Sequence, residues 1–128
     1  MPPSTQSSLK VLIVDDDSFQ IELLTETLAS IGVGGVLSAS SGAQALQHLS
    51  GVHVILLDLH MPQMDGFQFM EAAAKKGYAG ALILVSGQSA EVLHGASLVS
   101  RLRRFRLLGA LTKPVDRNAL TALLQQAV

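Results

Sequence analysis

Residues 54–66 of the chain read VILLDLHMPQMDG, and the apolar run at their start decides the fold class. A strand that is apolar at every position is covered on both faces, as in parallel sheets with helices on each side. Further apolar runs are separated by longer amphipathic stretches and lie at residues 11–14, 36–37, 81–85 and 110–111. This alternation predicts an α/β domain with five parallel strands and five helices.

Capping residues indicate where these helices begin. Ser18 is the expected N-cap of the first helix, and Gly32 is its expected C-terminal stop. Ser41 and Gln44 match a capping box at the second helix, and Asp116 precedes the fifth. The third helix is expected from about residue 65 to residue 77. The fourth is expected to present one apolar face, formed by Leu98, Leu102 and Phe105.

The composition fits one folded domain. The 128 residues are 48% hydrophobic and 15% charged, and the net charge of −1 provides no basic field for nucleic acid or an acidic membrane surface. The chain has no cysteine for a disulfide or a thiolate metal site, and no apolar stretch approaches the ~18 residues that span a bilayer. We expect a cytoplasmic protein in which residues 1–8 form a flexible tail and residues 9–128 form the domain.

Acidic residues are concentrated where the predicted strands end. Asp15, Asp16 and Asp17 directly follow the first strand, and Asp58 ends the third. Ligands of open α/β sheets bind at this edge, so Asp15, Asp16 and Asp58 are expected to meet there. Crowded carboxylates repel one another unless a cation lies between them, and oxygen donors suit a hard ion such as Mg²⁺. A simpler interpretation, strongest for Asp17, is that the acid only stabilises the N-terminus of the first helix.

Four motifs occur in order along the chain and read VLIVDDD at residues 11–17, VILLDLHMPQMDG at 54–66, VSG at 85–87 and LTKP at 111–114. Together they resemble the CheY-like receiver domain of two-component response regulators. The resemblance covers essentially all of residues 9–128. It implies a flavodoxin-like, doubly wound sheet with strand order 2-1-3-4-5. It also implies a signalling domain, not an enzyme, that accepts phosphate from a histidine kinase.

The resemblance assigns a metal site. Asp58 matches the phosphorylated residue and, with Asp16, the direct ligands of Mg²⁺. Asp15 matches the second acid, which holds a metal-bound water. His60 matches the position whose backbone carbonyl completes the metal site.

The resemblance also assigns two residues that contact the phosphoryl group. Ser86 matches the hydroxyl that reaches a phosphoryl oxygen, and Lys113 matches the cation that pairs first with Asp58 and then with the phosphate. Pro114 matches the proline that constrains the backbone of this lysine. A lysine at a loop-lined rim buries little, so its loss is expected to cost no more than ~0.5 kcal/mol of stability.

The sequence departs from the family pattern near the fifth strand. Ala110 stands three residues before Lys113, where the family usually has a tyrosine or phenylalanine that swings inward on activation. Residues 107–114 are similar to receivers that precede cyclic-di-GMP phosphodiesterase domains. Arg101, Arg103, Arg104 and Arg106 have no aromatic platform for nucleic-acid stacking, which favours a solvated helix face or a protein contact.

The expected partners are a sensor histidine kinase or a phosphotransfer protein. A C-terminal output domain and a second copy of the chain are left open, whereas direct contact with nucleic acid or a membrane is not expected. A Mg²⁺-dependent phosphohydrolase is a second class, but Asp58 lacks the further acid two residues on that such an enzyme needs. A third class is a receiver-like module that binds partners without phosphorylation.

Overall fold

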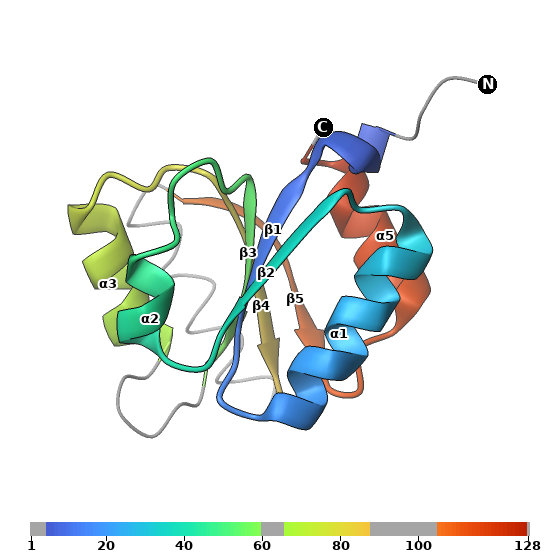
Figure 1. Ribbon diagram of the computed structural model, residues 1–128, viewed down its shortest axis with the longest axis horizontal. Helices are drawn as coiled ribbons and strands as arrows, with labels where there is room; N and C mark the ends of the chain where they lie inside the picture. Colours follow the sequence, from blue (N-terminus) through green and yellow to red (C-terminus); the bar gives the residue numbers. More distant parts are fainter. Residues whose placement is uncertain (1–4, 60–65, 88–104, 128) are drawn as a thin grey trace.

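The computed structural model describes residues 5–59, 66–87 and 105–127 and contains one five-stranded parallel sheet (Figure 1). The strand order is β2-β1-β3-β4-β5, which confirms the doubly wound arrangement. The strands are β1 at Lys10–Val14, β2 at Gly35–Ala39, β3 at Val54–Asp58, β4 at Ala81–Ser86 and β5 at Arg106–Thr112.

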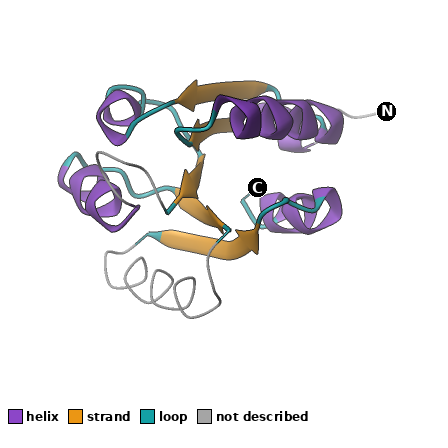
Figure 2. Ribbon diagram, turned by 90° about the horizontal axis from the view of Figure 1, so that it is seen from below, coloured by secondary structure: helices purple, strands orange, loops and turns teal. Residues whose placement is uncertain are grey.

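Helices cover both faces of the sheet (Figure 2). On one face lie α1 (Ser18–Ile31) and α5 (Arg117–Gln125), and on the other lie α2 (Gly42–Leu46) and α3 (Gly66–Lys75). A short 3-10 helix, η1 (Thr5–Ser8), precedes β1 and contacts α5. No helix within the described ranges is both long and apolar enough to cross a membrane.

The expected fourth helix falls on residues 88–104, which lie outside the described ranges. Its expected residue Phe105 is described and belongs to no helix. Phe105 lies directly before β5, is buried, and packs against Tyr78 with 6.0 Å between ring centroids. The prediction that Phe105 belongs to a helical face is therefore wrong, because the ring anchors the entry to β5.

Alternate strand residues supply two hydrophobic cores. On β1, Val11 and Ile13 pack toward α1 and α5, whereas Leu12 and Val14 pack toward α2 and α3. All five residues of β3 are buried, which explains why its sequence is apolar without alternation. The central strands β1 and β3 therefore end at a position that is enclosed on both sides.

The helix caps differ from expectation at two places. The N-cap of α1 is Asp17, whose side chain accepts a hydrogen bond from the backbone N–H of Phe19 at 2.9 Å, so Ser18 is the first helical residue. Ser41 caps α2 as expected, but the Gln44 side chain accepts from the backbone of Ser40 and not from that of Ser41. Gly32 ends α1 with a φ of 99°, and Asp116 caps α5.

Strand β5 is longer than its apolar sequence indicates. It is an edge strand with several exposed residues and a register irregularity opposite Leu82 and Ile83. A Cβ atom on Gly109 would lie 2.8 Å from the side chain of Leu123, so glycine allows α5 to pack closely here. Arg106, which begins the strand, donates a side-chain hydrogen bond to the carbonyl of Gln126.

Candidate functional site

Three carboxylates meet where β1 and β3 end. Asp15 directly follows β1, and Asp58 is the last residue of β3. Asp15 and Asp58 are 1% and 6% exposed, whereas Asp16 is exposed to solvent. One oxygen from each of the three lies within 4.8 Å of the others. The sequence prediction that these acids meet at one edge of the sheet is confirmed.

Lys113 brings a positive charge to this acidic cluster from the end of β5. Its Nζ lies 3.1 Å from Oδ2 of Asp15 and 3.5 Å from Oδ2 of Asp58. The backbone N–H of Lys113 donates to the carbonyl of Ser86 at 3.0 Å, which ties the residue to the end of β4. The following peptide bond, to Pro114, is cis. The ammonium is therefore shared by two buried carboxylates.

The pKa of Lys113 reflects this shared position. Burial by itself lowers the pKa of a lysine, because the charged form loses hydration. Close pairing with Asp15 and the negative charge of Asp58 outweigh burial, and the pKa of Lys113 is raised above its ordinary value. The lysine is thus held as a cation throughout the physiological range.

Asp15 shows that the cluster suits a metal ion. Its Oδ1 accepts a hydrogen bond from the backbone N–H of Asp17 at 2.9 Å, which orients the carboxylate. Its Oδ2 is buried and faces the Lys113 ammonium at 3.1 Å. Carboxylate oxygens are the donors that Mg²⁺ prefers. Asp15, Asp16 and Asp58 therefore fit a hard divalent cation.

Comparison with known proteins identifies the family. The family model described as the response regulator receiver domain matches residues 11–125. The chain belongs to this family. Receiver domains are signalling modules of two-component systems, and this chain is referred to below as the receiver.

Relatives of the receiver include both short and long proteins. It is 30% identical over 122 residues to the cyclic di-GMP phosphodiesterase RocR of Pseudomonas aeruginosa, covering 92% of this chain and 31% of RocR. It is 28% identical over 126 residues to a probable chemotaxis protein CheY of Rhizobium etli, covering 95% of this chain and 94% of that protein. The receiver thus spans about a third of one relative and nearly all of the other.

Solved structures show the same fold. A response regulator from Colwellia psychrerythraea superimposes with a TM-score of 0.79 at 31% identity, covering 94% of this chain and 97% of that one. The CheY4 chemotaxis protein of Vibrio cholerae superimposes with a TM-score of 0.77 at 25% identity, covering 94% and 98% of the two chains. These likenesses agree with the strand order described above.

Three other residues were singled out in the sequence, and each has a different outcome. Ser86 is fully buried at the end of β4, one residue beyond the partner of Asp58 in the sheet. His60 lies outside the described residues, so its carbonyl stays a prediction. Asp17 caps α1, which agrees with the simpler interpretation of that acid.

Ala110 presents only a methyl group to the surface of β5. Its neighbour Gly109 faces Leu123 on α5, so the Ala110 side chain projects from the opposite face of the strand, where it is exposed. The aromatic residue that the family usually has here is absent from this receiver.

An apolar surface next to the acidic cluster was not predicted from the sequence. The side chain of Phe19 is 63% exposed and that of Leu23 is 39% exposed, both on α1. A cavity of about 200 Å³ separates α1 from Pro114 and Val115, which follow Lys113. The sequence did contain a signal for this surface, because Phe19 lies outside the apolar stripe of α1 and cannot pack in the core.

Proposed function

We propose that this receiver accepts a phosphoryl group on Asp58 from a sensor histidine kinase or a phosphotransfer protein. The observation that carries the proposal is the placement of the Lys113 ammonium 3.5 Å from Asp58 and 3.1 Å from Asp15. A lysine in this position neutralises charge both before and after transfer. Phosphoryl transfer depends mainly on such positioning and charge neutralisation.

In the proposed reaction, a carboxylate oxygen of Asp58 is the nucleophile. It forms a bond to phosphorus while the phosphorus–nitrogen bond to the donor histidine breaks, giving an acyl phosphate on Asp58. Water later cleaves this acyl phosphate and restores the carboxylate. Burial of Asp58 at the end of β3 holds the attacking oxygen in a fixed position, which favours transfer.

Mg²⁺ is the proposed cofactor. Asp16 and Asp58 would bind it directly, Asp15 would hold a bound water, and the backbone carbonyl of His60 would complete the site. When bound, the ion supplies positive charge to the phosphoryl oxygens. The close approach of one oxygen from each of Asp15, Asp16 and Asp58, all within 4.8 Å of one another, supports this assignment.

Ser86 and Lys113 are the proposed sensors of the phosphoryl group. The Ser86 hydroxyl would donate to a phosphoryl oxygen, and the Lys113 ammonium would pair with the new charge. Their backbones are joined by the 3.0 Å hydrogen bond from Lys113 N–H to the Ser86 carbonyl. A movement of either residue would therefore reach the ends of both β4 and β5. This route does not need the aromatic side chain that Ala110 lacks.

The phosphodonor is proposed to dock on the apolar surface of α1. Phe19 and Leu23 are exposed, and Phe19 is two residues from the cap formed by Asp17. A donor helix that covers these side chains would bury apolar area beside the acceptor and orient the phosphohistidine toward Asp58.

The output of the receiver is proposed to be a change in protein contacts. RocR supports control of a cyclic-di-GMP phosphodiesterase domain, and the probable CheY supports action as a separate module. In either arrangement, the receiver would act through a bound output domain, a partner protein or a second copy of the chain.

Mass spectrometry after incubation with acetyl phosphate and Mg²⁺ tests the proposal. We expect an increase of about 80 Da that is lost in Asp58→Asn, because a phosphoryl group has been added. Continuous release of phosphate from many phosphoesters would instead identify a phosphohydrolase. An unchanged mass with retained partner binding would identify a module that is not phosphorylated.

A further inference from the structure

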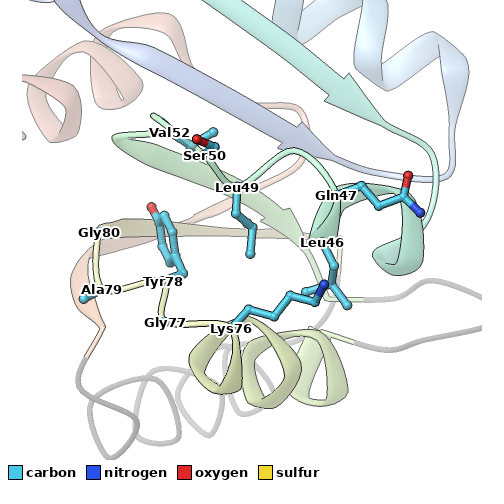
Figure 3. Close-up of a pocket in the computed structure, with 10 residues that line it drawn as sticks. All are labelled: Leu46, Gln47, Leu49, Ser50, Val52, Lys76, Gly77, Tyr78, Ala79 and Gly80. Carbon is cyan, nitrogen blue, oxygen red and sulfur yellow. The ribbon is translucent and has the colours of Figure 1, made fainter.

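A groove lies between the segment that follows α2 and the segment that follows α3, at the end of the sheet where the strands begin (Figure 3). Its volume is about 520 Å³. Val52, just before β3, and Gly80, just before β4, line it, whereas these strands end at Asp58 and Ser86. Val52 and Gly80 each lie six residues before these strand ends, and a strand rises ~3.3 Å per residue, so the groove is about 20 Å from the acidic cluster. It is therefore separate from the phosphorylation site.

The groove has a fixed apolar wall. Figure 3 shows the side chains of Leu49 and Tyr78 in the space between the segment that follows α2 and the segment that follows α3. The Tyr78 hydroxyl donates to the carbonyl of Ala81 at 2.6 Å, and its ring packs on Phe105. Burial raises the pKa of Tyr78, so the phenol stays neutral and the hydrogen bond is kept. The apolar wall is therefore already formed before a ligand binds.

The rim of the groove carries positive charge. Lys76, just beyond the end of α3, is exposed and is the charged member of the described lining. Lys10 reaches the same rim, where its Nζ donates to the carbonyl of Ser50 at 3.1 Å. The described lining contains no aspartate or glutamate. The acids Asp15, Asp16 and Asp58 lie at the opposite end of the sheet, where the strands finish.

We propose that this groove is a docking site for a segment of a partner protein that carries a large apolar side chain flanked by carboxylates. The apolar side chain would enter between Leu49 and Tyr78, where it gains burial against a preformed wall. A flanking carboxylate would pair with Lys76, and a second would lie near Lys10. A basic segment is disfavoured by like charge at the same rim. Because the groove and Asp58 lie at opposite edges, both sites can be occupied together.

A peptide titration followed by NMR tests the proposal. The probe is the acetylated, amidated peptide EELFEE, added to the ¹⁵N-labelled chain. We expect the backbone amides of Gly77, Ala79 and Val52 to shift while that of Asp58 does not. Lys76→Glu and Ala79→Glu should each weaken binding by about fivefold or more, because they place negative charge against the peptide.

Two exposed positions outside the groove provide matched controls. Lys75→Glu makes the same charge reversal one residue away, and Ala43→Glu makes the same substitution on α2. Both should bind the peptide as the wild-type chain does, and thermal melting should show all four variants folded. Equal loss of binding in the controls would mean that only net charge matters and would overturn the proposal.

Three further outcomes would also overturn it. One is the absence of shifts in the groove at millimolar peptide, and another is equal binding of the peptide KKLFKK. The third is self-association of the wild-type chain through the groove, detected as groove shifts on dilution that Lys76→Glu abolishes. That result would assign the groove to a second copy of the chain.

Discussion

Replacement of Lys113 by methionine tests the electrostatics of the acidic cluster. The substitution keeps an unbranched side chain, one atom shorter than lysine and uncharged, and leaves the carboxylates of Asp15 and Asp58, 1% and 6% exposed, without the ammonium. Breaking a fully buried ion pair costs about 3–5 kcal/mol, because a charge is left uncompensated. The Lys113 side chain is 21% exposed, so we expect a smaller loss, about 1–3 kcal/mol of unfolding free energy.

The expected loss exceeds the ~0.5 kcal/mol predicted from the sequence for a lysine at an exposed rim. It should also depend on pH. The pKa of Lys113 is raised in the folded chain, so its contribution is fully present below the ordinary lysine pKa of 10.5 and declines as the pH rises through the folded-state pKa. The difference between wild type and Lys113→Met should therefore be constant near neutral pH and shrink above pH 10.5.

Urea denaturation followed by circular dichroism measures this difference. Tyr78 also titrates at alkaline pH, but it is present in both proteins and cancels in the comparison. Lys75→Met is the control, because Lys75 is exposed on α3 and its loss should change stability by less than ~0.5 kcal/mol. Equal stability of Lys113→Met and wild type at neutral pH would show that the ammonium does not stabilise the two carboxylates.

Three other predictions concern the metal, the donor surface and the start of α3. Asp16→Ala should weaken Mg²⁺ binding at least about tenfold in a calorimetric titration, because a direct ligand is lost; wild-type affinity would rule out the assigned role. Phe19→Ser should slow transfer from a phosphorylated histidine kinase but not from acetyl phosphate, and equal slowing with both donors would argue against docking on α1. Gly66→Ala should cost about 1–3 kcal/mol in urea denaturation, because a Cβ there lies 2.9 Å from the Leu59 backbone. Gly87→Ala, where a Cβ would meet no atom of the described residues within 4 Å, should be neutral, and an equal cost at both glycines would contradict the steric reason.

The central strands were predictable because their environment is uniform. Strand β3 is buried at every position, so its sequence alone reports the burial. Edge strand β5 has one buried position, and its other positions are half-buried or exposed, so the apolar pair at residues 110–111 marks only part of it. Phe105 was assigned to a helix because a large apolar residue is expected at a buried position of either a helix or a strand entry. The sequence does not show that Phe105 is buried against Tyr78.

The acids of the site were predictable from their position after apolar runs, but their individual contacts were not. Asp17 and Ser18 are both good N-caps, and only the path of the backbone selects Asp17. The resemblance indicated pairing of Lys113 with Asp58. The structure places the ammonium nearer to Asp15 than to Asp58, although β3 lies between β1 and β5 in the sheet, and no pattern in the sequence indicates this.

The short connection between β1 and α1 restricts how this gene can change. Asp15 orients itself through the N–H of Asp17, and Asp17 in turn caps the helix through the N–H of Phe19. The orientation of each acid depends on a backbone N–H two residues further along the chain, so one inserted or deleted codon would disturb the acidic cluster and the helix start together. Point substitutions can accumulate on the outer face of α1, but residues 15–17 should tolerate no change in length.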